Sequence, residues 1–548
     1  MCGIWVYIDN NQTVKFNTVQ FNEDLYHYFM NIQSRGPDHS SFNQYSNNVF
    51  VGFHRLAIMD PSPVSNQPYV VELDNGETAI FVCNGEIYNY KKLNETYDLG
   101  ITHNSDCMVI PLLYKKCGMD YKRFVNLFEN EIEGEFSFVM TVLNSKNEVS
   151  HIVAGRDHVG IRPLYHGQHN GTAIFSSEIK ACSFFNGPVL EFQPGTIQRF
   201  CYDDDGVMSY VDFHPFEWVS LVSPVNKPDE TYLRDVKNAL VNSIKKRLTA
   251  DVPIGFLLSG GVDSSLVCAI ASGLSKKPIR TFCCGLAGGS DLKYARMVAD
   301  YIGSDHTEVI FTEEEALNAI NEVIYTTETW DTTTIRASVG QYLVSKFISR
   351  NTDIKVLLVG EGPDEICSSY LFNWYAPSAS EMHYVALDYI SNIHKYDVRR
   401  VDRCLAAFGL EARVPYLDPE FIRAYWEIPP EKRTPQSNGI EKWWLRKCAD
   451  GENPLLPPEV MWRKKEAFSD GISAVEKSWF SIIKDHIHAN YGLTEEQYYI
   501  HSFVEMFGKH RVRIIDGYWQ PRWDKEGNVI SSYVDPSART LEVYNKTT

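Results

Sequence analysis

The second residue of the chain is a cysteine, in the opening segment MCGIW. If the initiator methionine is removed, the thiol of Cys2 lies beside its own α-amine. An α-amine titrates at about 7.7–8.0 and a thiol at about 8.5, so near neutral pH the amine can accept the thiol proton. The thiolate could then attack a carboxamide, releasing ammonia and leaving a thioester. Any chain can carry cysteine at this position by chance, so the rest of the sequence must decide.

The segments that this reaction needs are present in the first 110 residues. In VCNGEIYNY, the side-chain amide of Asn84 and the backbone N–H of Gly85 can both donate to one oxyanion. Arg55, in GFHRLAIMD, is suited to a substrate carboxylate because guanidinium binds carboxylates in a bidentate fork. Glu86 and Asp106 could hold an ammonium group. The pattern is consistent with a thiol that releases ammonia from the carboxamide of an amino-acid substrate.

A second motif, IGFLLSGGVDSSLV, predicts a phosphate-binding turn. We expect a strand that ends at Leu258, a tight turn at Gly260 and Gly261, and a helix that begins near Ser264. Consecutive N–H groups in such a turn, together with the helix N-terminus, form a cradle for phosphate. The lysine of a Walker A loop is absent, so this is not a P-loop of that type.

Polar side chains in the same loop suit a nucleotide. Asp263 can hold Mg²⁺ against the phosphates. Three hydroxyl groups can add hydrogen bonds, those of Ser259, Ser264 and Ser265. SGGVDSS resembles the pyrophosphate loop of the N-type ATP pyrophosphatases, and that resemblance implies attack of a carboxylate on the α-phosphorus of ATP.

An acidic loop, GEGPDEI, follows a further apolar run, IKVLLV. It places Glu361, Asp364 and Glu365 at the carboxyl end of a predicted strand, where α/β sheets bind ligands. The three carboxylates suggest Mg²⁺ coordination and handling of an amine or ammonia. Lys465, in RKKEAFSDG, is a candidate cation for the charge that develops as pyrophosphate leaves. The alternative is a solvated turn that caps a helix.

These motifs belong to two predicted domains. A length of 548 residues exceeds one ordinary core. The first two hundred residues alternate short strands (IWVYI, FVGF, AIFVCNG, FSFVMTVL, HIVAG) with turns. ETYLRDVKNALVNSIKKRL predicts an amphipathic helix, and strands alternate with helices beyond it, which indicates an α/β parallel sheet. The boundary is expected between about residues 200 and 220.

Composition excludes several classes. A formal net charge of −18 disfavours general nucleic-acid binding. No apolar run is long enough to span a bilayer, and the start does not match a signal peptide, so no membrane partner is expected. The 12 cysteines include no C-x-x-C pair, which favours a reducing, cytoplasmic compartment.

The motifs together resemble the glutamine-hydrolysing asparagine synthetases. MCGIW, SRGPD, GFHRLAIMD, CNGEIYNY, GRDHVGIRPLY and SSEIKA look like the class II glutamine amidotransferase domain of that family. SGGVDSS, GEGPDE, GLEARVPYLD, GIEKWWLRK, WRKKEAFSDG and DPSART look like its synthetase domain. The likeness runs in order from Cys2 to Arg539.

The resemblance implies a fold and a reaction. The fold is an N-terminal nucleophile αββα sandwich, residues 2–205, followed by an α/β parallel-sheet ATP-pyrophosphatase domain, residues 215–548. The reaction makes L-asparagine from L-aspartate, ATP and glutamine-derived ammonia through β-aspartyl-AMP, giving AMP, diphosphate and L-glutamate. An internal tunnel would carry the ammonia. The small-molecule partners are L-glutamine, L-aspartate and ATP with Mg²⁺, and family members often form homodimers.

The resemblance also assigns residues. Cys2, Asn84, Gly85, Glu361 and Lys465 would be catalytic, Glu361 in forming the intermediate. Glutamine would contact Arg55, Leu56, Ala57, Ile58, Met59, Asn84, Gly85, Glu86 and Asp106. ATP would contact Leu258, Ser259, Gly260, Gly261, Asp263, Ser264, Ser265, Cys284, Val359 and Gly360. Asp263 and Asp364 would bind the metal.

Three positions depart from the family pattern, and they keep alternatives open. Val359 and Pro363 stand where the family has serine in SGEGSDE, and Tyr375 replaces a usual lysine. One alternative is an impaired synthetase fold that only binds nucleotide or amino acid. Another is an amidotransferase that adenylates a different carboxylate. A phosphoribosyl or sugar-phosphate amidotransferase conflicts with SGGVDSS.

Overall fold

The computed structural model describes residues 1–10, 19–203, 207–216, 222–463, 471–473, 478–515 and 517–534. Its contacts divide the chain into two compact units. Unit 1 comprises residues 1–217 together with two short later segments, 406–410 and 507–514. Unit 2 comprises the remainder, from residue 218 onward. The two later segments of unit 1 had no counterpart in the sequence prediction, whose domain limits of 2–205 and 215–548 stay a prediction.

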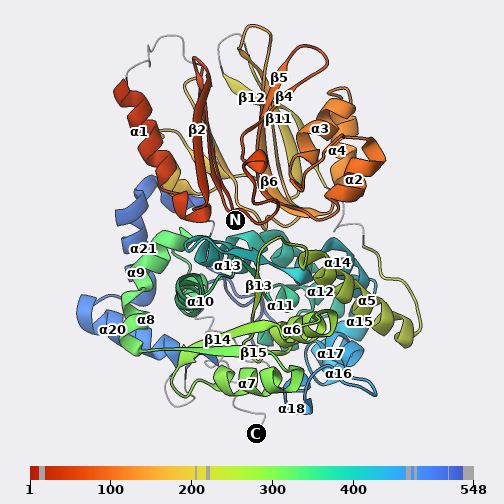
Figure 1. The fold of residues 1–548 in the computed structure, drawn as a ribbon. Helices are drawn as coiled ribbons and strands as arrows, with labels where there is room; N and C mark the ends of the chain where they lie inside the picture. Colours follow the sequence, from red (N-terminus) through yellow and green to blue (C-terminus); the bar gives the residue numbers. More distant parts are fainter. Residues whose placement is uncertain are drawn as a thin grey trace. The chain divides into compact units, whose positions relative to one another are not determined.

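Unit 1 is built on two six-stranded sheets whose described pairings are all antiparallel (Figure 1). The first sheet has the order β10-β8-β9-β1-β3-β2 and the second β12-β11-β7-β6-β5-β4. The strands are β1 (Gly3–Asp9), β2 (His39–Ser46), β3 (Val49–Arg55), β4 (Tyr69–Glu72), β5 (Thr78–Ile87), β6 (Gly134–Leu143), β7 (Val149–Arg156), β8 (Tyr165–His169), β9 (Thr172–Ser176), β10 (Val189–Glu191), β11 (Thr196–Tyr202) and β12 (Met208–Pro215). The five strand segments predicted in this region are confirmed.

The two sheets share one core and carry helices on their outer faces, which confirms the αββα prediction. Ile4 of the first sheet and Val82 of the second belong to the same fully buried apolar cluster. On the outer face of the first sheet, Gly52 leaves room for the ring of Phe29, 2.6 Å from where a Cβ would stand. On the second sheet, the rings of Phe128 and Phe138 lie 5.5 Å apart. The helices are α1 (Val19–Met30), α2 (Tyr90–Tyr97), α3 (Val109–Lys116) and α4 (Tyr121–Asn130).

Unit 2 contains a five-stranded sheet in which all neighbours pair in parallel. Its order is β15-β14-β13-β16-β17. The strands are β13 (Ile254–Leu257), β14 (Arg280–Leu286), β15 (Asp305–Phe311), β16 (Val356–Leu358) and β17 (Glu411–Arg413). The chain winds outward from β13 to β15 and then returns to β16 on the other side of β13. Ligands bind at such a reversal, outside the carboxyl ends of the two strands.

Helices surround this sheet in unit 2, and they include the predicted amphipathic helix, α5. Their bounds are α5 (Asp229–Arg247), α6 (Val262–Leu274), α7 (Ser290–Ile302), α8 (Glu313–Asn318), α9 (Ile320–Thr327), α10 (Thr332–Asn351), α11 (Pro363–Ile366), α12 (Ala379–Asn392), α13 (Asp397–Ala406), α14 (Pro419–Trp426), α15 (Pro430–Arg433), α16 (Pro435–Asn438), α17 (Trp443–Ala449), α18 (Pro458–Met461), α20 (Trp479–Tyr491) and α21 (Glu495–Phe507). Among the described residues, no helix combines the length and apolarity needed to cross a membrane.

Short 3₁₀ helices complete the two units. They are η1 (Gln33–Arg35), η2 (Pro63–Ser65), η3 (Ile179–Cys182), η4 (Leu371–Tyr375), η5 (Ile393–Lys395), η6 (Pro415–Leu417) and η7 (Lys509–Ile514).

The phosphate-loop helix begins two residues earlier than the sequence predicted. α6 starts at Val262 because Gly261, with φ −72° and ψ 154°, already has the extended backbone of an N-terminal cap. Strand β13 ends at Leu257, although the N–H of Leu258 still donates to the carbonyl of Phe282 at 2.8 Å.

A buried histidine ties α1 to the first sheet of unit 1. His54 is fully buried in β3, and its ring stacks on Phe29 with centroids 3.8 Å apart. Its Nε2 lies 3.1 Å from the carbonyl oxygen of Phe29, and its Nδ1 lies 2.7 Å from the Ser40 hydroxyl. Burial lowers the pKa of His54 to about 4, and the bond to the Phe29 carbonyl only partly offsets this.

Because His54 is buried in its neutral form, we expect the folded state of unit 1 to lose stability in acid. In the unfolded chain the imidazole titrates near about 6.5, so the unfolded state binds more protons below that pH. The stability that His54 contributes is complete above the unfolded pKa and is lost as the pH falls toward 4. Between pH ~6.5 and ~5.5 the opening free energy of β3 should fall by about 1 kcal/mol more in the wild type than in His54→Gln. This opening free energy is measured by hydrogen exchange of peptides from β3, after correction for the pH dependence of the intrinsic exchange rates. Equal pH dependence in both proteins would contradict the assignment.

Candidate active sites

The backbone of Cys2 is fixed at both ends inside unit 1. Its N–H donates to the side-chain Oδ1 of Asn84 at 2.8 Å. Its carbonyl accepts a bond from Nε of Arg35 at 2.8 Å. Arg35 is fully buried and forms an ion pair with Glu178 at 2.5 Å. The sequence analysis did not identify Arg35 as a site residue, although it had included SRGPD among the motifs.

Asn84 presents an unsatisfied donor beside Cys2. The residue is fully buried in β5, and no hydrogen-bond partner for its Nδ2 is found in the described part of the chain. A buried amide donor without a partner is costly, and a ligand oxygen bound beside Cys2 would satisfy this one. Next to it, a Cβ on Gly85 would stand 2.3 Å from the carbonyl oxygen of Glu135, which requires glycine there. Asn84 Nδ2 can therefore donate to an oxyanion beside Cys2, and the second donor, the N–H of Gly85, stays a prediction.

The segment that follows β3 reaches the thiol of Cys2. The Sγ of Cys2 lies 3.8 Å from the carbonyl oxygen of Leu56. Arg55, at the end of β3, is 5% exposed, and its guanidinium is bonded to uncharged oxygens of the following loop. The acceptors are Ser62 O at 2.8 Å, Asn66 Oδ1 at 2.7 Å, Met59 O at 3.2 Å and Asp60 O. These bonds fix the guanidinium against neutral partners.

The other predicted glutamine-site residues lie just after β3 and near the end of β5, except Asp106, which lies in the segment before α3. Ala57 donates its N–H to Oδ2 of Asp38 at 2.8 Å, and Ile58 is buried. Asp106 accepts the N–H of Ile87 at 2.7 Å. Glu86 is 6% exposed in β5. The structure thus brings Leu56, Asn84 and Cys2 into contact, and it anchors Asp106 to the strand that carries Asn84.

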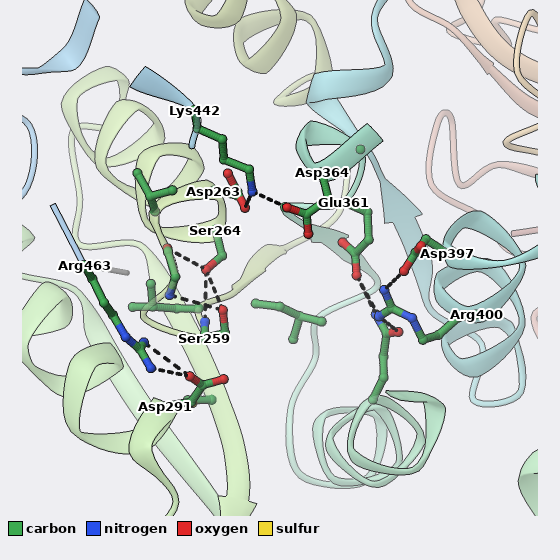
Figure 2. A pocket seen from close by; sticks show the side chains of 18 of the residues that line it. Ser259, Asp263, Ser264, Asp291, Glu361, Asp364, Asp397, Arg400, Lys442 and Arg463 are labelled. Carbon is green, nitrogen blue, oxygen red and sulfur yellow. Dashed lines mark hydrogen bonds and ion pairs between the residues drawn. The ribbon is translucent and has the colours of Figure 1, made fainter. Parts of the chain in front are cut away.

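In unit 2, one pocket lies where the strand order reverses, and both predicted loops line it (Figure 2). Of the predicted residues, its described lining includes Leu258, Ser259, Gly261, Asp263, Ser264, Cys284, Gly360, Glu361, Asp364 and Glu365. Three predicted ATP contacts are not part of that lining, namely Gly260, Ser265 and Val359. Lys465 lies outside the described residues.

The two loops approach each other closely because glycines stand at the contact. Gly260 has φ +75°, and a Cβ there would be 2.5 Å from the backbone nitrogen of Ala295 in α7. A Cβ on Gly360 would be 2.7 Å from the backbone nitrogen of Ser264, at the N-terminus of α6. The Ser264 hydroxyl lies 3.0 Å from that of Ser259, so the turn is braced internally. This leaves the helix N-terminus facing the pocket, which suits a phosphate.

A lysine that the sequence analysis did not identify joins the two loops. Nζ of Lys442 lies 2.5 Å from Oδ2 of Asp263 and 2.5 Å from Oδ1 of Asp364 (Figure 2). Its side chain is 3% exposed. Burial would lower the pKa of this ammonium, but the two carboxylates raise the pKa above the ordinary lysine value. The segment GIEKWWLRK had been noted only for its family likeness.

A second buried cluster surrounds Glu361. Nη1 of Arg400 lies 3.1 Å from Oε1 of Glu361, and its Nη2 is paired with Asp397. Gln341 accepts a bond from the same guanidinium at 2.9 Å and lies 3.4 Å from Oε1 of Glu361. Burial raises the pKa of Glu361, and Arg400 opposes that rise. Arg400 and Asp397 lie in α13, outside any motif that the sequence analysis had treated as functional.

The carboxylates of the pocket suit a divalent cation that is also bound by phosphate. Oδ1 of Asp263 is buried, and within the described ranges it has no hydrogen-bond partner. No group of three His, Cys, Asp or Glu side chains positioned to hold a metal occurs among the described residues. Mg²⁺ commonly takes one or two protein carboxylates and completes its shell with substrate phosphates and water. Asp263 and Asp364 fit that arrangement.

The departures from the family pattern lie outside the described lining of this pocket. Val359 is buried, and its N–H donates to the carbonyl of Arg413 at 3.1 Å. Pro363 is the first residue of α11, a position where the missing N–H would have had no helical partner. Tyr375 packs against the apolar cluster around Phe372. Each of the three residues is therefore accommodated by the fold without being part of the described pocket lining.

Comparison with known proteins covers the whole chain. The family model for a glutamine amidotransferase domain matches residues 1–220, and that for asparagine synthase matches residues 235–387 and 374–524. The human glutamine-hydrolysing asparagine synthetase is 36% identical over 591 residues, covering 99% of each chain. The chicken enzyme of the same name is 36% identical over 595 residues, again covering 99% of each. A solved glutamine phosphoribosylpyrophosphate amidotransferase from B. subtilis, 12% identical, covers 56% of this chain and 81% of its own with a TM-score of 0.32.

The contact between Gly360 and α6 predicts a sensitive position for nucleotide binding. Gly360→Ala should push β16's loop away from Ser264, because a Cβ–N separation of 2.7 Å is too short for real atoms. We expect ATP affinity to fall tenfold or more, about 1.4 kcal/mol. Gly273→Ala is the matched control, since a Cβ there, also in α6, meets nothing within 4 Å. Calorimetric titration with ATP measures both, and equal affinities would contradict the close approach.

Proposed function

Since the chain belongs to the glutamine-hydrolysing asparagine synthetase family, we propose that it is an enzyme that makes L-asparagine from L-aspartate, ATP and L-glutamine. The ammonia comes from the amide of glutamine, and the products are AMP, diphosphate, L-glutamate and L-asparagine. The observation that carries this proposal is that SGGVDSS and GEGPDE line one pocket, with the Glu361 carboxylate held there by Arg400.

The glutaminase step uses the α-amine of Cys2 after removal of Met1. That amine, positioned by Oδ1 of Asn84, takes the thiol proton, and the thiolate attacks the amide carbon of glutamine. The Asn84 Nδ2 and the Gly85 N–H donate to the oxyanion. The proton passes to the departing ammonia, and water then hydrolyses the thioester to glutamate. Arg55 and Asp106, with Glu86 and the backbone of residues 56–59, hold the amino-acid end of the substrate.

The synthetase step takes place in the pocket of unit 2. The β-carboxylate of aspartate attacks the α-phosphorus of ATP, and diphosphate leaves from the SGGVDSS loop. Mg²⁺, when bound by Asp263 and Asp364, neutralises charge on the phosphates. Glu361, oriented by Arg400, faces the β-aspartyl-AMP, which ammonia then opens to asparagine and AMP. Lys465 supports the departing diphosphate. These roles follow from the chemistry of the residues and the family likeness.

The oligomeric state is proposed from the family, and the other partners and the location are proposed from the composition of the chain. We infer a homodimer in the cytoplasm, with no nucleic acid and no membrane partner. Sedimentation of the purified chain and fractionation of cells that express it would test these two points.

The deciding assay follows all products together. Purified protein with ATP, Mg²⁺, aspartate and glutamine should release asparagine and diphosphate in equal amounts. Cys2→Ala should lower glutamine hydrolysis by about 10⁴-fold or more and leave ammonia-dependent synthesis intact, because it removes the nucleophile of one site only. Glutamate without asparagine would contradict the proposal and favour an impaired synthetase. Diphosphate release with another carboxylate, and none with aspartate, would favour the other amidotransferase.

Loss of an oxyanion donor should lower glutamine hydrolysis less than loss of the Cys2 thiol does. Asn84→Ala removes one donor and the acceptor that holds the Cys2 nitrogen, so glutamate release should fall by about 10²–10³-fold. Ammonia-dependent asparagine synthesis serves as the internal control and should not change. Unchanged glutaminase activity in this variant would exclude Asn84 from the reaction.

A further inference from the structure

Lys442 fills the position between the two carboxylates to which the metal has been assigned. Its ammonium lies 2.5 Å from one oxygen of Asp263 and 2.5 Å from one oxygen of Asp364. Both oxygens contact the same nitrogen, so they are close enough to share a single cation. The pair is nearly sealed from water on the lysine side, where the side chain is 3% exposed.

The backbone holds this lysine in an unusual conformation. Lys442 has φ +58°, a region that L side chains rarely adopt. Its carbonyl accepts the N–H of Arg446 at 2.9 Å and thereby begins α17. Strained residues persist where the surrounding structure fixes them, and they concentrate at functional sites. The side chain is thus directed between the aspartates from a fixed anchor and does not reach them by chance from a mobile surface.

An ammonium and a divalent ion cannot both bind these oxygens from the same position. Mg²⁺ requires its oxygen ligands at about 2.0–2.1 Å, inside the volume that Nζ occupies. A metal that took these same two oxygens, Oδ2 of Asp263 and Oδ1 of Asp364, in a pocket without nucleotide would have to displace Lys442. That would leave an ammonium buried without its counter-ions, which is strongly unfavourable.

We propose that Lys442 acts as an internal cation that excludes divalent metal from Asp263 and Asp364 until nucleotide is present. The phosphates of ATP bring several negative charges into the pocket. Lys442 can then bond to phosphate oxygens while the aspartates bind the metal, and every charge keeps a partner. Metal affinity and nucleotide affinity are therefore coupled, and by linkage the coupling is the same in both directions. This inference rests on the proposed function in one respect, the assignment of ATP to the pocket.

The test measures Mn²⁺ binding to the full chain without nucleotide, by the loss of the electron paramagnetic resonance signal of aqueous Mn²⁺. The wild type should bind Mn²⁺ weakly. Lys442→Met, which leaves two facing carboxylates without their ammonium, should bind it at least tenfold more tightly. Mn²⁺ should also raise the thermal midpoint of this variant more than that of the wild type. A lysine with only a structural role would lower that midpoint without creating a metal site.

Two controls locate the effect. Lys447→Met changes an exposed lysine of the same helix, whose side chain is 43% exposed and paired with Asp450, and it should bind Mn²⁺ as the wild type does. Adding Asp263→Asn to Lys442→Met should abolish the gained affinity. A Lys442→Met protein that folds and gains no Mn²⁺ affinity would overturn the proposal.

If Lys442→Met fails to fold, the wild type and Asp263→Asn still test the proposal. Tight, stoichiometric Mn²⁺ binding to the nucleotide-free wild type, lost in Asp263→Asn, would overturn the proposal. Weak binding that tightens at least tenfold when inorganic diphosphate is added, beyond the signal loss that the same diphosphate causes without protein, would support it. None of these readouts involves turnover, so a failure of the proposed synthetase activity would be seen separately in the product assay.

Discussion

The pocket of unit 2 must accept anionic ligands although carboxylates form much of its wall. Asp263, Asp364 and Glu361 come from two loops that the reversal of strand order brings together. Carboxylates gathered in one partly buried pocket repel one another. Their negative charges must therefore be balanced by cationic side chains from other segments of the chain. Lys442 and Arg400 provide that balance. The two loops therefore depend on ion pairs with Lys442, just before α17, and with Arg400 in α13.

Unit 1 places the proposed nucleophile, Cys2, next to the N-terminus of the chain. Terminal residues are usually poorly ordered. Here β1 pairs with β3 and β9 and lies in the middle of its sheet, so the backbone becomes rigid one residue after Cys2. Asn84 and Arg35 then fix the nitrogen and carbonyl of Cys2 itself. The central strand β1 and the two side-chain bonds thus hold the backbone of a residue that lies next to the N-terminus.

Both folds and both loops of the unit 2 pocket could be predicted from the sequence, because the sequence patterns that indicate them are local. Alternating apolar runs, paired glycines and acids at strand ends are all contained within a dozen residues. The residues that it missed are brought to the sites by tertiary folding. Lys442 is 179 residues from Asp263, Arg400 is 39 from Glu361, and Arg35 is 33 from Cys2. A lone basic residue in a helix or turn has no spacing that marks it. The start of α6 was misplaced because the sequence does not reveal the extended, capping backbone of Gly261.

The burial of Lys442 also determines how chemical probes will treat it. Amine-reactive reagents modify lysines that are solvent-accessible and readily deprotonated. Lys442 is 3% exposed, and its aspartate partners raise its pKa. It will therefore be among the slowest lysines of this protein to react, and labelling surveys that rank lysines by nucleophilicity will pass over it. A lysine of this kind is recognised from the two carboxylates that contact it. Its slow reaction with such reagents is a measure of the strength of its ion pairs with Asp263 and Asp364.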